Sequence, residues 1–319
     1  MLMWIVGFTL IVLTLSLFIG WLITKRFDKS LRATFPRSGK VTPVTGGSIH
    51  WTVSGHGTTV ILVHGLAGNL HNFRSLEKAL AEKYQVYCLD RPGSGHSGRK
   101  YRTDPSFTNQ TRMIAEWMQK EGIEPAIFVG HSMGGAISLN LAINAPEKVK
   151  GLALICPLTA PLNIRPSRAA QFYFRSRLLR YIVAKVFSPL IHKKIGQRQV
   201  SVIFKPEKPP SNFAREHGGA LAMLSDAFLA ASGDLSNAQK SLREQVKQYK
   251  QIECPVSVLY GQDDRVLNCQ EHTSMIEKTV PHAFTKVLPN KGHMLPITAV
   301  QECCDIIDEV LERSSLQYQ

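Results

Sequence analysis

Short apolar runs alternate with helical patterns over most of the chain after residue 45. The runs that we predict to be strands are residues 48–53, 59–63, 85–89, 126–129, 151–155, 256–260 and 284–288. Several of them are almost continuously apolar, as expected for strands that are buried on both faces of a parallel sheet. Helical patterns lie between them, for example at 72–83, 109–121 and 133–145. This alternation predicts an α/β fold with a doubly wound, mostly parallel sheet.

The alternation stops between residues 157 and 250, where long helical patterns and a proline-rich stretch replace it. An insertion of this size between two sheet strands predicts a helical cap over the carboxyl ends of the strands, where ligands bind in open α/β sheets. The predicted organisation is therefore an anchor (1–24), a basic linker (25–45), a first core part (46–156), the cap (157–250) and a second core part (251–319).

The first 24 residues, from Met1 to Thr24, carry no charge. They are long and apolar enough to cross a hydrocarbon core as a helix, and Trp4 and Trp21 lie near the ends, as interfacial aromatic residues do. A cleaved signal peptide is the alternative, but no basic segment precedes the apolar stretch and no small-residue cleavage site follows it. We therefore expect a single-pass transmembrane helix.

The net charge of +14 predicts an anionic partner. Basic residues follow the apolar stretch at once, and none precedes it: Lys25, Arg26, Lys29, Arg32, Arg37 and Lys40. By the positive-inside rule, we expect the N-terminus outside and the catalytic domain in the cytoplasm. A nucleic-acid partner is disfavoured because no recognised binding motif accompanies the charge.

The six cysteines show neither CxxC pairs nor a metal-ligand spacing with histidine. We expect buried free thiols, which fit a reducing compartment. The sequence therefore predicts neither a metal ion nor another cofactor.

The predicted strand at 126–129 leads into the sequence GHSMGG (130–135) and then into a helical pattern. This is a G-x-S-x-G motif in a strand–turn–helix context, which makes Ser132 a candidate nucleophile. A serine hydroxyl is a poor nucleophile at neutral pH, so a base has to take its proton and a third group has to orient that base.

Two later strands end in titratable residues, within GQDDRV (261–266) and PNKGHM (289–294). Because carboxyl ends of parallel strands share one edge of the sheet, these residues should lie at the same edge as Ser132. His293 is the candidate base, and Asp263 and Asp264 are the candidates for the residue that orients it.

Four segments together resemble the α/β-hydrolase family. HGLAG (64–68) resembles its oxyanion loop, DRPGSGHS (90–97) resembles its D-x-P-G-x-G-x-S turn, and the two segments above resemble those that carry its acid and base. The resemblance runs from about residue 45 to the C-terminus and implies the α/β-hydrolase fold. The family's spacing after Gly261 selects Asp264 over Asp263, and the family's oxyanion hole corresponds to the backbone N–H groups of Leu66 and Met133.

Other polar residues of these segments have structural roles in this interpretation. His64 should shape the oxyanion loop, His131 should pack beside the serine turn, and His96 and Ser97 should stabilise the turn at 90–97.

The resemblance implies a carboxylic ester hydrolase that works through an acyl-serine intermediate. A serine nucleophile disfavours the aspartate-dependent members of the family, such as epoxide hydrolases and haloalkane dehalogenases. The anchor and the apolar, basic cap make the chain similar to membrane-bound monoacylglycerol lipases, which implies lipid-derived esters as substrates. Two alternatives to ester hydrolysis are acyl transfer and carbon–carbon bond cleavage by the same catalytic triad of Ser132, His293 and Asp264. A third is a catalytically silent ligand-binding receptor on the same fold.

The cap has no acidic residue between Pro161 and Pro206, although basic residues recur there. Leu179, Ile182 or Val183, and Val186 have helical spacing, which predicts an apolar stripe beside a basic face. We expect this face to contact anionic lipid. The candidate contacts are Arg175, Arg177 and Arg180. The alternative is that the apolar residues pack on the core and the charges face water.

Overall fold

The computed structural model describes residues 1–161, 174 and 176–317. Its centre is a nine-stranded sheet with the order β1-β2-β4-β3-β6-β7-β8-β9, in which β5 pairs with β2. The strands are β1 (Lys40–Val44), β2 (Gly47–Ser54), β3 (Thr59–Val63), β4 (Gln85–Leu89), β5 (Gly98–Arg99), β6 (Ala126–His131), β7 (Val149–Ile155), β8 (Val256–Gly261) and β9 (Phe284–Leu288). Only the pairs that involve β2 are antiparallel among these strands, which confirms the predicted mostly parallel sheet.

Helices of the core cover the central strands. They are η1 (Leu70–Phe73), α2 (Arg74–Leu80), α3 (Phe107–Glu121), α4 (Met133–Asn144), η2 (Pro146–Lys148), α9 (Cys269–Thr279), α10 (Leu295–Thr298) and α11 (Val300–Gln317). The sequence specifies their ends locally: Ser106 caps α3 by accepting a hydrogen bond from the Asn109 N–H, and Gly122 ends it in the left-handed conformation. Every residue of β6 is buried, as its apolar sequence predicts.

The segment 25–45 is not the linker that we expected. Helix α1 (Leu2–Thr34) continues through its first part, and β1 occupies its end. The strand was missed because Lys40–Val44 carries Pro43 and alternates only weakly, which is typical of an edge strand. Among the strands of the described residues, it pairs only with β2.

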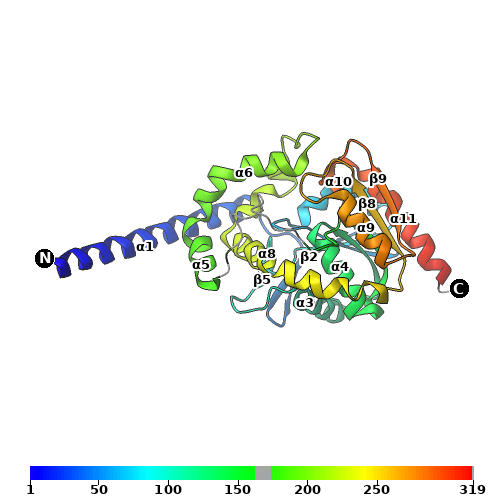
Figure 1. Cartoon of the computed structure of the whole chain (residues 1–319), viewed down its shortest axis with the longest axis horizontal. Coiled ribbons are helices and arrows are strands. Elements are labelled where there is room, and N and C mark those ends of the chain that lie inside the picture. Colours follow the sequence, from blue (N-terminus) through cyan, green and yellow to red (C-terminus); the bar gives the residue numbers. More distant parts are fainter. Residues whose placement is uncertain (162–173, 175, 318–319) are drawn as a thin grey trace.

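Helix α1 is long and apolar enough to cross a membrane, and its most apolar window is not buried by the rest of the chain. Figure 1 shows it extending away from the domain. Its C-terminal part packs on the insertion: the carboxylate of Asp28 accepts hydrogen bonds from the backbone N–H (3.0 Å) and the hydroxyl (2.5 Å) of Ser225. The part of α1 that carries the first basic residues is therefore packed on the cap, while Lys25, Arg26 and Lys29 are themselves exposed.

The insertion between β7 and β8 is helical, as predicted, and we call it the cap. Its elements are α5 (Arg177–Ile182), η4 (Val183–Phe187), α6 (Ser188–Phe204), α7 (Phe213–Glu216), η5 (Gly219–Met223), α8 (Ser225–Val246) and η6 (Tyr249–Gln251). In Figure 1, α6 lies beside the C-terminal half of α1, and η4 contacts the same part of α1. Of the basic residues that the sequence analysis emphasised, Arg175 lies outside the described residues.

Candidate active site

Ser132 forms the sharp turn between β6 and α4, with φ 55° and ψ −120°. This conformation is rare for a residue with a side chain and is typical of a constrained functional position. The turn requires glycine on both sides. A Cβ on Gly134 would lie 1.9 Å from the carbonyl oxygen of Val63, and a Cβ on Gly130 would lie 2.6 Å from the Cα of Gly135. The G-x-S-x-G pattern is thus explained by close backbone packing.

Asp264 follows β8, and His293 lies in the loop after β9. The Nδ1 atom of His293 lies 2.6 Å from Oδ2 of Asp264, whose side chain is fully buried. The other carboxylate oxygen accepts hydrogen bonds from the backbone N–H groups of Val266 (2.7 Å) and Leu267 (3.0 Å). Burial acts to raise the pKa of Asp264, but His293 and these N–H donors together lower it below its ordinary value. Asp264, not Asp263, is therefore the carboxylate that holds the histidine ring.

His131 holds the histidine loop beside the serine turn. Its Nε2 lies 2.9 Å from the backbone carbonyl oxygen of His293 and donates to it, because a carbonyl can only accept. Burial first, and then the nearby His293, lowers the pKa of His131 to about 3, so its ring is neutral. The predicted role as a packed neighbour is confirmed. The hydroxyl of Ser132 makes no hydrogen bond within the described part of the chain, and such contacts often form only with substrate.

The loop at 64–68, which the sequence predicts to be the oxyanion loop, is fixed through one carbonyl group. The carbonyl oxygen of Gly65 accepts hydrogen bonds from His64 Nδ1 (2.8 Å), Arg91 Nη2 (3.1 Å) and the Gly68 N–H (3.2 Å). In a trans peptide the N–H of the next residue, Leu66, points the opposite way. The loop also touches the serine turn, since a Cβ on Gly65 would lie 3.0 Å from the Cβ of Ser132. Three donors thus fix the direction of the Leu66 N–H.

His64 shapes this loop, as predicted. Its Nε2 accepts a hydrogen bond from the backbone N–H of Arg91 (2.9 Å), while Nδ1 donates to Gly65. Burial, followed by the charge of Arg91, lowers the pKa of His64 to about 3. The ring is therefore neutral and connects two loops as donor and acceptor.

The turn at 90–97 is built around Asp90. One oxygen of this carboxylate accepts from the Leu70 N–H (2.8 Å), and the other accepts from the His96 N–H (2.8 Å) and lies 2.7 Å from His50 Nδ1. The hydroxyl of Ser97 donates to the backbone carbonyl of Asp90 (2.6 Å). The predicted stabilising role of Ser97 is confirmed, whereas His96 takes part in the turn through its backbone N–H.

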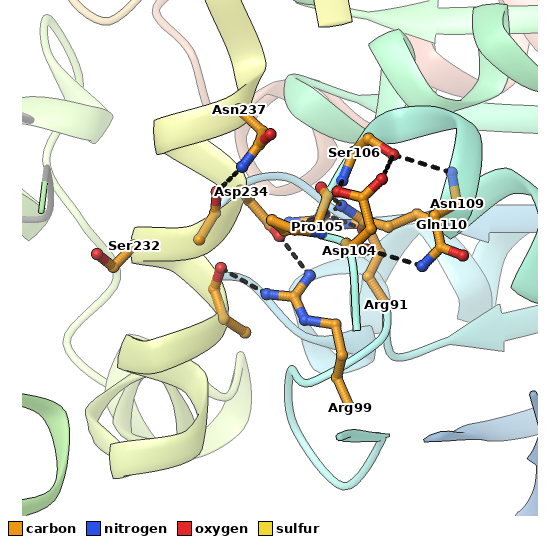
Figure 2. A network of polar contacts seen from close by, with 12 residues as sticks. Arg91, Arg99, Asp104, Pro105, Ser106, Asn109, Gln110, Ser232, Asp234 and Asn237 are labelled. Carbon is orange, nitrogen blue, oxygen red and sulfur yellow. Dashed lines mark hydrogen bonds and ion pairs between the residues drawn. The ribbon is translucent and has the colours of Figure 1, made fainter. Parts of the chain in front are cut away.

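A buried charge network that no sequence pattern predicts joins the cap to the core. Arg91 Nη1 lies 3.0 Å from one carboxylate oxygen of Asp234 in α8, and Arg99 Nη1 lies 2.5 Å from the other (Figure 2). Gln110 adds hydrogen bonds to Arg91 (2.8 Å) and Asp234 (3.2 Å). Since Arg91 also donates to Gly65, one side chain joins the cap to the oxyanion loop. Arg91 and Asp234 are 143 residues apart, and no local pattern indicates such a pair.

Apolar cap residues surround the site on two sides. Leu66 packs against a cap cluster of Ala184, Phe228 and Leu235. Met294, next to the candidate base, packs with the cap residues Phe204 and Phe213. The cap also holds the histidine loop by a polar contact, because the Gly292 N–H donates to the carboxylate of Glu207 (2.9 Å).

Cys156 lies close to the Asp264–His293 pair. Ligand-type atoms of these three residues lie within 4.8 Å of one another, a spacing that also suits a metal ion. Burial, however, raises the pKa of Cys156 well above its ordinary value, so the thiol keeps its proton and is a poor ligand. The carboxylate of Asp264 is already engaged by three donors. The arrangement fits proton transfer better than metal binding.

Arg180 does not have the environment that we expected for a lipid contact. The residue is 8% exposed, and its Nη2 donates to the Phe174 carbonyl (2.7 Å) and the Ser236 hydroxyl (3.1 Å). A guanidinium enclosed in this way is withdrawn from a flat membrane surface. Of the three candidate contacts, Arg177 is the one that is described and exposed.

The fold and the serine turn define the class of protein: residues 58–300 match the family model for the alpha/beta hydrolase fold, and the chain belongs to this family. Among its relatives, the dihydrolipoyllysine-residue acetyltransferase component of the acetoin cleaving system of Pseudomonas putida is 29% identical over 81% of this chain and 65% of that protein. A Homo sapiens monoacylglycerol lipase is 24% identical over 81% of this chain and 76% of that protein.

The chain spans less than two thirds of the length of the acetyltransferase components that it matches. Among solved structures, a membrane phospholipase A superimposes with a TM-score of 0.67 at 22% identity, over 97% of this chain and 99% of that one. A putative lipase from Acinetobacter baumannii superimposes with a TM-score of 0.69 at 21% identity, over 92% and 97% of the two chains. At these identities the structural likeness concerns the fold.

Proposed function

We propose that this protein is a membrane-anchored serine hydrolase that cleaves carboxylic esters, with lipid-derived esters of the monoacylglycerol kind as substrates. The observation that carries the proposal is the 2.6 Å hydrogen bond between Asp264 and His293, next to Ser132 in its strained turn. Because Nδ1–H donates to the carboxylate of Asp264, the lone pair of the neutral ring lies on Nε2, where a general base needs it.

The reaction has two half-reactions. In the first, Ser132 Oγ attacks the ester carbonyl while His293 takes its proton and then delivers it to the leaving alcohol, so that an acyl-serine forms. In the second, His293 takes a proton from water, the water oxygen attacks the acyl-serine, and the acid is released with regeneration of Ser132. Asp264 stabilises the imidazolium in both steps without becoming protonated.

The negative charge of each tetrahedral intermediate is assigned to the N–H groups of Leu66 and Met133. Met133 is the first residue of α4, where an N–H group has no intrahelical acceptor and the helix dipole favours an anion. The Leu66 N–H is directed by the three donors on Gly65 and has no acceptor within the described residues. Two preset donors of this kind stabilise an oxyanion without reorganisation.

The substrate assignment rests on the apolar cap surfaces beside the site. Leu66 and Met294 flank the catalytic residues and both contact apolar cap clusters, which suits an acyl chain. The similarity to a protein named monoacylglycerol lipase supports the same class of substrate. Each additional buried CH₂ contributes about 0.8 kcal/mol to binding, so longer acyl chains should react more efficiently than acetate.

Membrane attachment through α1 accompanies this chemistry. The uncharged, unburied apolar stretch supports a single-pass span, and the basic residues after it support a cytoplasmic catalytic domain with the N-terminus outside. No nucleic-acid partner belongs to the proposal.

The second candidate is acyl transfer with the same triad, which the similarity to acetyltransferase components favours. It differs from hydrolysis only in the acceptor that attacks the acyl-serine. Product analysis for one ester at increasing glycerol concentration distinguishes acyl transfer from hydrolysis. A transferase forms more acylglycerol and less free acid as the glycerol concentration rises.

The deciding experiment combines a fluorophosphonate probe with esters of graded acyl length. We expect the full-length protein to be labelled and to prefer medium or long acyl monoesters, and Ser132→Ala to lose labelling and at least about 10⁴-fold in kcat while remaining folded. Full labelling of Ser132→Ala would refute the nucleophile. A length series that peaks at acetate would refute the lipid-ester assignment alone.

A further inference from the structure

A cavity lies away from Ser132, Asp264 and His293, between α1, the cap helices α5 and α8, and the segment around β5. Its volume is about 320 Å³, and none of the triad residues lines it. Basic side chains dominate its lining: Arg32, Arg37, Arg99, Lys100, Arg177 and Arg180. Asp226 is the acidic residue among the described residues that line it.

The positive charge in this cavity is largely uncompensated. Arg99 is paired with the buried Asp234, but Asp226 is shared between Arg32 (3.4 Å) and Lys185 (2.6 Å), which lies outside the lining. For the remaining cations, Arg37, Lys100, Arg177 and Arg180, the described part of the chain provides no ion pair. Like charges gathered in this way repel one another, and an anion would relieve the repulsion.

Arg180 has unused hydrogen-bonding capacity in this cavity. Its Nη2 is bonded, whereas its Nε is buried and has no partner among the described residues. Burial, and then the charges of Arg99 and Arg177, lower the pKa of Arg180. A second lining residue, His96, also has a buried ring nitrogen, Nε2, without a partner in the described chain. These two nitrogens are enclosed by the protein, so the donor that Arg180 offers to the cavity is Nη1, which is not among the enclosed atoms and has no hydrogen bond within the described residues.

Gly233 of α8 leaves room for two guanidinium groups. A Cβ at this position would lie 3.2 Å from Nη1 of Arg180 and 3.2 Å from Nη2 of Arg99. The two arginines therefore converge on a helix position without a side chain. Arg99 donates to Asp234 and to the carbonyl oxygen of Ala230, so it contributes charge at this point, whereas Nη1 of Arg180 has no hydrogen bond among the described residues and can donate to an anion.

The cavity lies near the end of the predicted membrane span, and this position indicates where a bound anion would come from. Arg32 belongs to α1 itself and lies about two helical turns beyond Thr24, where the uncharged stretch ends. A membrane crossed by that stretch would place phospholipid headgroups next to the cavity. We propose that this cavity binds a phosphate group, carried either by a lipid headgroup or by a soluble phosphate ester. The proposal goes beyond ester hydrolysis, and binding is measured without any ester present.

The test uses the full-length protein in phosphatidylcholine nanodiscs. One arm adds glycerol 3-phosphate to the solution, and the other replaces part of the lipid by phosphatidic acid; thermal stabilisation and calorimetry report binding. The cavity variant carries Arg37→Gln, Lys100→Gln and Arg177→Gln, which are all exposed residues without ion pairs within the described chain. The matched control carries Lys193→Gln, Lys194→Gln and Arg198→Gln on the exposed side of α6 and loses the same charge.

We expect the cavity variant to lose about fivefold in affinity for each charge removed, and the control to keep the affinity of the unsubstituted protein. Unfolding midpoints without ligand show that each variant is folded, and arginine-to-lysine versions of the cavity variant should regain most of the affinity. Binding of phosphatidic acid alone would identify the ligand as a lipid headgroup, and binding of glycerol 3-phosphate would identify it as a soluble phosphate ester. Either result supports the proposal. No binding in either arm, or equal weakening by the control, overturns it.

Discussion

The carboxylate of Asp234 lies 3.0 Å from the guanidinium group of Arg91, and both side chains are shielded from solvent. Asp234 belongs to the cap, whereas Arg91 follows β4 in the core and also donates to the carbonyl oxygen of Gly65. The position of the cap and the direction of the Leu66 N–H therefore depend on the same arginine. The cap thus helps to hold the loop at 64–68, which carries one of the two proposed oxyanion donors.

Removing Asp234 should leave two buried guanidinium groups without their carboxylate. Breaking a buried ion pair by removing one partner costs about 3–5 kcal/mol, so Asp234→Ala should lower the free energy of unfolding by that amount in denaturant titrations. Glu244→Ala, which breaks an exposed pair with Lys247 (3.3 Å), should change it by less than about 1 kcal/mol. Similar effects of the two substitutions would contradict the assignment of the network.

The conservative variant Asp234→Asn tests whether Asp234 positions the loop at 64–68 in addition to stabilising the fold. It keeps the shape of the side chain but weakens its hold on Arg91, so we expect kcat to fall more than KM changes, because the oxyanion donor acts in the transition state. A rise in KM with unchanged kcat would assign Asp234 to cap closure alone.

The two neighbouring aspartates should behave differently. Asp264→Asn keeps a hydrogen bond to His293 but favours the wrong tautomer, and kcat should fall by about 10⁴-fold. Asp263→Asn should change kcat by less than about threefold, because the structure gives its side chain no hydrogen bond or ion pair within the described residues. The kcat values of the two variants are compared on one soluble ester. A larger loss of kcat in Asp263→Asn than in Asp264→Asn would mean that Asp263 is the functional acid.

Acid should destabilise the protein through its buried histidines. The pKa of His131 is lowered to about 3, whereas an unfolded chain takes up this proton near pH 6.5. Between these values the unfolded state binds more protons, so the free energy of unfolding falls as pH decreases from about 6.5 toward 3, by up to about 1.4 kcal/mol per pH unit for one histidine. Above pH 6.5 this contribution is constant.

His131→Gln should flatten this pH dependence, because glutamine can donate a hydrogen bond but does not titrate in this range. Urea titrations at a series of pH values compare the two slopes. Identical slopes for the variant and the unsubstituted protein would show that His131 is not the neutral buried donor described above.

Membrane attachment is tested independently of catalysis. The full-length protein should remain in the pellet after alkaline carbonate extraction, and a C-terminal reporter should be active in the cytoplasm, because the basic cluster follows the apolar stretch. Removal of residues 1–24 should release the protein into the soluble fraction. A reporter active only outside the cytoplasm would reverse the predicted orientation.

The sequence predicts the parallel sheet and the serine turn because both have local causes. Buried strands such as Thr59–Val63 are continuous apolar runs, and the glycines around Ser132 reflect a backbone that allows no side chains there. The edge strand Lys40–Val44 has no such signature. It pairs with a single described strand and is buried on one face, so its sequence need not be continuously apolar. Its pairing can be recognised only when the position of β2 in the folded sheet is known.

The charges of the cap are predicted less well, because composition does not reveal which side of a helix meets a partner distant in sequence. Arg180 and Arg177 are separated by less than one helical turn, yet Arg180 is buried in a cavity and Arg177 is exposed. The Arg91–Asp234 pair shows the same limit, since it joins segments that come together only after the sheet and the insertion have formed.

The contact between Asp28 of α1 and Ser225 of the cap has a mechanical consequence. Ser225 begins α8, and Asp234 of the same helix is paired with Arg91 and Arg99 of the core. If α1 is fixed in a bilayer, α8 therefore connects the anchor to the core through polar contacts at two points along its length. The orientation of the domain toward the bilayer would then depend on this helix as well as on the chain connection from α1 to β1.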